Sequence, residues 1–117
     1  MKAFAKYWLP VILWAGSIFF VSSLPGEEIP SLFSGQEIVF HIFEYALLTL
    51  LLLRALKNAA CKSFASRNLR LLVAIVFCLI YAAGDEFHQQ FTSGRVSSVS
   101  DFLIDGLGII LGSIIYL

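Results

Sequence analysis

The sequence predicts an all-α membrane protein with four transmembrane helices, arranged as two hairpins with both termini in the cytoplasm. Its composition is 59% hydrophobic and 14% charged, whereas soluble domains average roughly 45–50% apolar and about 25% charged residues. Four apolar segments reach or approach membrane length, and basic residues gather at alternate ends of these segments. We therefore expect one membrane domain over residues 1–117, with helices near 4–23, 37–56, 71–90 and 101–117.

The first apolar segment, residues 4–23, follows Lys2 and Lys6 and so resembles the start of a secretory signal peptide. Its apolar run exceeds the core of about 7–15 residues that signal peptides usually have, which favours a permanent transmembrane helix. Pro10 fits this prediction, because it lies in the first turns, where a missing backbone N–H costs least. A loop rich in proline and glycine follows at residues 24–36.

Polar residues interrupt the second and third apolar segments near one end of each. In residues 37–56, His41, Glu44 and Tyr45 have the spacing i, i+3, i+4 and so share one helix face. Residues 57–70 form a basic loop, and residues 71–90 end in the sequence DEFHQQ. Because the polar part comes first in one helix and last in the next, both parts are expected on the same side of the membrane.

The fourth apolar segment, residues 101–117, carries two kinds of helix-packing signal. Asp101 and Asp105 lie at i and i+4, so both carboxylates share one face near the start of the helix. Gly108 and Gly112 form a GxxxG pair, which allows two membrane helices to approach closely. We expect this pair to pack within one chain.

The distribution of charge predicts the topology. Loops that carry lysine and arginine stay in the cytoplasm, and the N-terminus with the loop at 57–70 and its flank holds seven of the eight basic residues. Two crossings between them agree with the apolar segments. The carboxylates, both histidines and Arg95 then all lie on the extracytoplasmic side, where the second, third and fourth helices bring their polar ends to one level.

This convergence predicts a polar pocket, because an ionisable group in the bilayer core costs about 2.5–3.5 kcal/mol on insertion scales. A purely structural network that fixes helix register would need only one or two polar residues. The candidate catalytic residues are His41, Glu44, Glu86 and His88. The candidate substrate-binding residues are Tyr45, Asp85, Gln89, Arg95, Asp101 and Asp105.

Three chemistries fit such a pocket. The pairs His41-x-x-Glu44 and Asp85-x-x-His88 each place an imidazole and a carboxylate on one helix face, as in the metal sites of helix bundles. The acids and histidines could instead transfer protons on a lipid-linked headgroup that Arg95 holds by its phosphate. A pocket that only binds a headgroup or a glycopeptide is the third possibility. The sequence leaves the metal, any cofactor and the oligomeric state open.

Other classes of function are disfavoured. No Ser/His/Asp or Cys/His arrangement for nucleophilic catalysis stands out, and Cys61 and Cys78 are interpreted as structural thiols rather than a disulfide or a zinc knuckle. The basic residues are dispersed along a loop and are explained as a topology signal, so nucleic acid is not an expected partner.

The same residues resemble the VanZ-like family of small bacterial membrane proteins. The first helix ends in Ser22-Ser23-Leu24-Pro25, and the second carries His41-x-x-Glu44-Tyr45. The most specific element is DEFHQQF at residues 85–91, followed by Gly94-Arg95 and by Ser98, Asp101, Asp105, Gly108 and Gly112. The chain departs from the family's common pattern ahead of His41, where a lysine is frequent, and at Ser93, where a proline is frequent.

The resemblance implies a multi-pass protein of the bacterial cytoplasmic membrane. The founding member of the family is associated with low-level resistance to teicoplanin, a lipid-tailed glycopeptide antibiotic, and the family brings no settled reaction or cofactor. The expected function is therefore to bind or modify a lipid-anchored cell-envelope molecule, with membrane lipids or a lipoglycopeptide as partners. Whether the chain is an enzyme stays open. The alternative is a non-catalytic binding or scaffold protein whose polar cluster is a structural helix-packing network.

Overall fold

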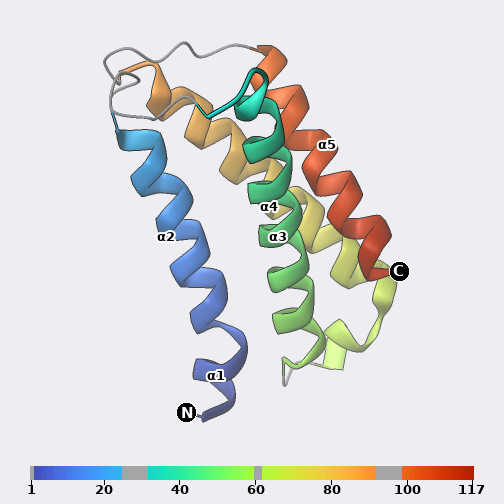
Figure 1. Cartoon of the computed structure of the whole chain (residues 1–117). Helices are drawn as coiled ribbons and strands as arrows, with labels where there is room; N and C mark the ends of the chain where they lie inside the picture. The colour runs from blue at the N-terminus through green and yellow to red at the C-terminus, as the bar shows by residue number, and fades with distance from the viewer. Residues whose placement is uncertain (1, 25–31, 60–61, 92–98) are drawn as a thin grey trace.

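The computed structural model describes residues 2–24, 32–59, 62–91 and 99–117, and within them the regular elements are all helices, with no strand (Figure 1). Four spans are long and apolar enough to cross a membrane: Phe4–Ser23, Gln36–Lys57, Arg67–Gln89 and Val99–Tyr116. The elements in chain order are α1 (Lys2–Tyr7), α2 (Leu9–Ser23), α3 (Gln36–Lys57), the 3-10 helix η2 (Lys62–Ala65), α4 (Arg67–Gln89) and α5 (Val99–Tyr116). The prediction of an all-α protein with four membrane-length helices is thereby confirmed.

The first span is broken at Trp8, between α1 and α2. Pro10 lies in the first turn of α2 and has no N–H to donate to the carbonyl of Lys6 four residues earlier. The guanidinium of Arg54 fills that role, because its Nη1 donates to the Lys6 carbonyl oxygen at 3.2 Å. Arg54 also lies over the ring of Tyr7, 4.8 Å from its centroid. Pro10 therefore marks the boundary between α1 and α2, and Arg54 of α3 supplies the hydrogen bond that Pro10 cannot donate.

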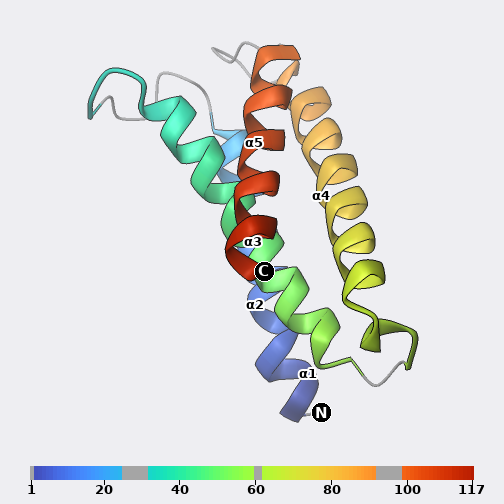
Figure 2. The same cartoon turned by 90° about the vertical axis from the view of Figure 1, so that its right-hand side faces the viewer.

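The tightest packing joins α3 to α5, which belong to different hairpins of the predicted topology. The two helices run in the same direction and cross in Figure 2. A Cβ at Gly108 would lie 2.5 Å from the carbonyl oxygen of Ile42, and a Cβ at Gly112 would lie 2.6 Å from that of Ala46. Only glycine allows the two backbones to approach so closely. The prediction that this GxxxG pair packs within the chain is confirmed.

The third span begins earlier than the apolar run suggests, at Arg67 rather than at Leu71. Ser66 caps this helix, since its Oγ accepts a hydrogen bond from the Leu69 N–H at 3.3 Å. Arg70 is buried and donates from Nη1 to the carbonyl oxygens of Phe64 and Ala65. The η2 turn thus packs on the start of α4, and two basic residues predicted for the loop lie in the helix.

Polar side chains attach α2 to the rest of the bundle. Few of its residues are buried, and it lies on the far side of α3 from α5 (Figure 1). The Trp14 indole donates to the Glu44 carbonyl oxygen at 2.9 Å, and the Tyr81 hydroxyl donates to the Ala15 carbonyl oxygen at 2.5 Å. In a bilayer, where lipid tails are as apolar as leucine, such hydrogen bonds contribute to helix association that hydrophobic burial does not drive.

Charge divides the bundle into two ends, which we name the acidic end and the basic end. At the acidic end α2 and α4 finish while α3 and α5 begin, and at the basic end α3 gives way to α4 (Figure 1). Every described carboxylate belongs to the half of a helix near the acidic end, and every described lysine and arginine belongs to the other end. The helix dipoles agree with this placement, because Glu37 and Asp101 lie in the first turns of α3 and α5.

Candidate functional site

The site begins with a contact between α3 and α5. His41 Nδ1 lies 2.6 Å from Asp105 Oδ1, and the Asp105 side chain is fully buried. Gly108 lies one turn after Asp105 and packs on Ile42, the neighbour of His41. The close approach that the glycine permits therefore sets the distance between the imidazole and the carboxylate.

A second contact joins α3 to α4. The Tyr45 hydroxyl donates to Asp85 Oδ2 at 3.2 Å, and both residues are buried. Tyr45 lies one turn after His41 on α3, as the spacing of the sequence predicts. One turn further, Thr49 donates to the Tyr45 carbonyl oxygen and contacts the Cys78 thiol, so the buried seam becomes less polar toward the basic end.

Glu86 completes a group of three. One oxygen of Glu86, one ring nitrogen of His41 and one oxygen of Asp105 all lie within 4.8 Å of one another. The Glu86 side chain is 7% exposed. We use the name polar cluster for five residues that come from three helices. They are His41, Tyr45, Asp85, Glu86 and Asp105.

Glu44 and Asp101 lie at the margin of the polar cluster. Glu44 interacts electrostatically with His41 and with Tyr45, and Asp101 interacts electrostatically with His41 and Asp105. Both are partly exposed. The structure therefore places seven of the predicted residues in one region, with five carboxylates around a single imidazole.

His88 and Gln89 face α2 instead of His41. The His88 ring stacks on Phe19 with centroids 4.5 Å apart, and its Nε2 lies 2.9 Å from Ser23 Oγ. Gln89 donates to Ser22 Oγ at 3.3 Å. The Ser23 hydroxyl donates its proton to the Phe19 carbonyl oxygen, so it accepts from a His88 N–H. This serine–histidine pair is consequently not arranged as a nucleophile and its base.

Sequence reasoning assigned the site to three helices and missed the fourth. The end of α2 contributes Ser22 and Ser23 as hydrogen-bond partners of α4, and Phe19 as a stacking surface. Ser22 and Ser23 belong to the family pattern in the sequence, but the sequence does not show that they form hydrogen bonds with Gln89 and His88. Arg95, the predicted phosphate ligand, lies outside the described residues, as do Glu27, Glu28 and Cys61.

The polar cluster also has hydrogen-bonding capacity that the described residues do not use. Asp105 Oδ2 and Asp85 Oδ1 are buried and have no hydrogen-bond partner within the described part of the chain. A buried carboxylate oxygen without a partner is costly, most of all in a membrane. The arrangement can therefore accept further donors or a cation, and the His41–Asp105 pair has the geometry of a general base with its orienting carboxylate.

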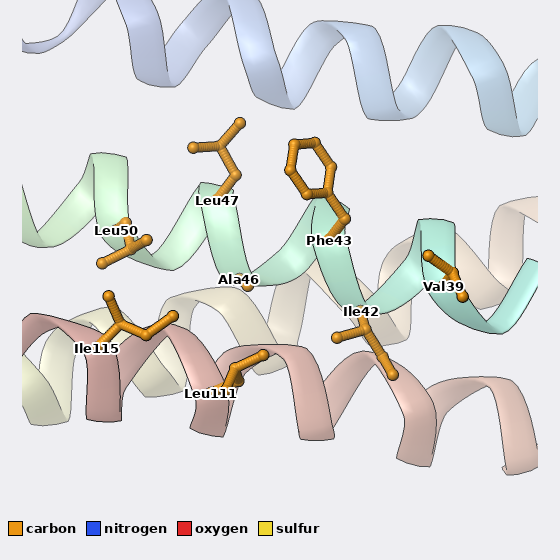
Figure 3. A pocket seen from close by; sticks show the side chains of 8 residues that line it. All are labelled: Val39, Ile42, Phe43, Ala46, Leu47, Leu50, Leu111 and Ile115. Carbon is orange, nitrogen blue, oxygen red and sulfur yellow. The ribbon is translucent and has the colours of Figure 1, made fainter.

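An apolar groove runs along α3 and α5 from the level of the polar cluster toward the basic end. It has a volume of about 410 Å³, and its lining residues are Val39, Ile42, Phe43, Ala46, Leu47, Leu50, Leu111 and Ile115. Figure 3 shows Phe43 and Leu47 pointing toward α2, while Leu111 and Ile115 extend from α5 toward α3. Ile42 follows His41 in the sequence, so one end of this groove lies at the level of the polar cluster, although none of the five cluster residues lines it.

Four apolar helices with a buried polar cluster at one end define a multi-pass membrane protein. The sequence profile of the VanZ/LLP1 family matches residues 7–117, which is nearly the whole chain. The chain belongs to the VanZ/LLP1 family, and the resemblance seen in the sequence is confirmed. Neither the curated proteins nor the solved structures contain a match.

Proposed function

We propose that this protein binds or modifies a lipid-anchored molecule of the bacterial cell envelope at the polar cluster, with reduced susceptibility to teicoplanin-type glycopeptides as one outcome. It would do so in the cytoplasmic membrane, with the acidic end on the extracytoplasmic side. The observation that carries the proposal is that the apolar groove along α3 and α5 begins at the level of the polar cluster on the same two helices. A molecule with a polar headgroup and an apolar tail is the ligand that matches both surfaces.

In this proposal each part of the ligand has its own contacts. The tail would lie in the groove beside Leu111, and the headgroup would meet the carboxylates and His41. Arg95 would hold an anionic headgroup by bidentate hydrogen bonds. If a reaction occurs, His41, oriented by Asp105, is the base, and Glu86, with an oxygen within 4.8 Å of a His41 ring nitrogen, is the candidate acid. Glu44 at the margin of the polar cluster and His88 beside α2 remain candidate catalytic residues, while Tyr45, Asp85, Gln89 and Asp101 remain candidate substrate-binding residues.

The test of ligand binding uses a matched pair of groove variants. Leu111→Trp fills the groove, whereas Ile114→Trp places the same bulk on an exposed part of α5 outside the groove. Native mass spectrometry with a lipid-linked peptidoglycan precursor should show weaker retention for Leu111→Trp alone. Phosphatidylglycerol serves as the competitor that tests for general lipid binding. Equal retention by both variants would contradict the proposal.

The test of the cellular role compares two antibiotics. Expression of the protein in a susceptible host should raise the inhibitory concentration of teicoplanin more than that of a glycopeptide without a lipid tail. Glu86→Gln keeps the shape and hydrogen bonding of Glu86, so an enzyme should lose this effect while a pure binder keeps it. Arg95→Ala should abolish the effect in both cases.

A structural polar network is the second candidate function, since the His41–Asp105 and Tyr45–Asp85 contacts each join two helices. In that case His41→Ala and Glu86→Ala should lower the thermal midpoint in detergent, and any effect on antibiotic susceptibility should follow the amount of folded protein. A variant that keeps the thermal midpoint yet loses the cellular effect would exclude this reading.

A further inference from the structure

We propose that His41, Glu86 and Asp105 form the binding site of a single divalent metal ion, with Zn²⁺ as the ion that fits best. The three donor atoms come from α3, α4 and α5 and all lie within 4.8 Å of one another. Tetrahedral ligands about 2.0–2.2 Å from Zn²⁺ lie roughly 3.3–3.6 Å apart, so side-chain shifts of about 1 Å would bring the three donors onto one ion.

The buried carboxylate of Asp105 supports this site independently of the spacing. Asp105 is 0% exposed, and although its Oδ1 pairs with His41, its Oδ2 has no hydrogen-bond partner within the described ranges. Asp85, 4% exposed, has the same property at Oδ1. A buried carboxylate oxygen that accepts no hydrogen bond can instead coordinate a cation.

The charges of the chain lead to the same conclusion. Five carboxylates gather at or beside the polar cluster, from Glu44, Asp85, Glu86, Asp101 and Asp105. In the sequence from Leu71 to Leu117 the only lysine or arginine is Arg95. Even when Arg95 and His41 are both counted as positively charged, the five carboxylates outnumber them. Bound protons or a divalent cation can offset this excess of negative charge, and a metal titration distinguishes the two.

The chemistry of the donors selects the ion. One imidazole nitrogen with two carboxylate oxygens is a mixed set that suits Zn²⁺, whereas Ca²⁺ and Mg²⁺ prefer oxygen ligands alone. Three protein ligands leave a coordination position open, as in catalytic rather than structural zinc sites. This grouping replaces the sequence-based pairs His41-x-x-Glu44 and Asp85-x-x-His88, because His88 engages Ser23 and Phe19 instead.

The test measures metal binding directly and needs no lipid ligand. Tag-free full-length protein in detergent micelles is stripped with EDTA and titrated with ZnCl₂ by calorimetry, and the bound metal is counted by elemental analysis. We expect one tight Zn²⁺ per chain and much weaker binding of Ca²⁺ and Mg²⁺. Glu86→Gln and Asp105→Asn should each weaken Zn²⁺ binding by about tenfold or more.

A matched histidine variant supplies the control. His88→Asn removes the other imidazole and should leave Zn²⁺ affinity within about twofold of the parent. Glu86→Gln preserves the size of the side chain, so we expect it to fold. Circular dichroism and gel filtration check this. Co²⁺ in place of Zn²⁺ gives a visible spectrum that His41→Asn should change and His88→Asn should not.

Two results would overturn the metal site: no stoichiometric Zn²⁺ binding by the stripped protein, or binding that Glu86→Gln and Asp105→Asn leave unchanged. The metal site does not depend on the proposed envelope function. Lipid retention can be measured in EDTA, without metal, so its result is independent of the Zn²⁺ titration.

Discussion

His41 on α3 and Asp105 on α5 meet at 2.6 Å between Nδ1 and Oδ1. The two helices belong to different hairpins, run parallel and touch through Gly108 and Gly112. Helix packing and site geometry therefore depend on the same few residues. A change in the glycine seam should alter the site, and a change in the site should alter the packing.

The first prediction concerns Gly108. Gly108→Ala should cost about 1–3 kcal/mol of stability, because its Cβ would meet the backbone of Ile42 and force α5 away. Gly106→Ala on the same helix is the control, since nothing lies within 4 Å of its Cβ; it should be neutral or slightly stabilising. Denaturant titration in detergent micelles measures both. Equal losses would contradict the close approach of the two backbones.

The second prediction concerns the buried ion-pairing groups. Asp105→Ala should destabilise the protein by about 1–3 kcal/mol, because it leaves the His41 N–H without its acceptor. Asp105→Asn keeps a carbonyl oxygen for that bond and should cost less. The exposed Glu37 provides the reference, and Glu37→Gln should change the thermal midpoint little. If Asp105→Ala behaves like Glu37→Gln, the pair does not hold α3 to α5.

The third prediction separates a hydrogen bond from ring packing. Tyr45→Phe removes only the hydroxyl that donates to Asp85 and should cost about 1 kcal/mol, the size typical of hydrogen bonds between membrane helices. Tyr116→Phe is the matched control, because Tyr116 is also at least partly buried and its hydroxyl makes no hydrogen bond within the described part of the chain. Thermal unfolding of the two variants should differ, and identical midpoints would argue against the Tyr45–Asp85 bond.

The fourth prediction tests the orientation in the membrane. In a background carrying Cys61→Ser and Cys78→Ala, a membrane-impermeant maleimide should label Gln90→Cys in intact cells. It should label Ser63→Cys only after lysis. Both positions are exposed, at the acidic and the basic end respectively. The reverse pattern would place the acidic end in the cytoplasm and remove the basis for a role on envelope lipids.

Much of the architecture was readable from residue order because membrane helices leave strong local signals. An apolar run long enough to span a bilayer must form a helix, since no water is present to satisfy an open backbone. Residue order predicts a loop at Arg67 and Arg70, because the apolar run begins only at Leu71. The helix in fact begins at Arg67, where Ser66 caps its N-terminus.

Contacts between helices were harder to predict. The spacing of His41 and Tyr45 placed both on one face, and the structure turns that face toward α4 and α5. The spacing does not predict that His88 faces α2. A sequence shows which residues share one face of a helix, but it does not show which other helix packs against that face. Ser22 and Ser23 gained significance only from their partners on α4.

Residue order was enough to predict the class of protein, the four spans, the separation of acidic from basic residues and the family, because apolar runs, charges and motifs are read along the chain. The packing of the helices was needed to show that α3 and α5 form the central pair, that Asp105 pairs with His41, and that Glu86 lies beside them. Those choices depend on how closely two backbones can approach, and that distance is set by glycines on one helix against the carbonyl groups of another.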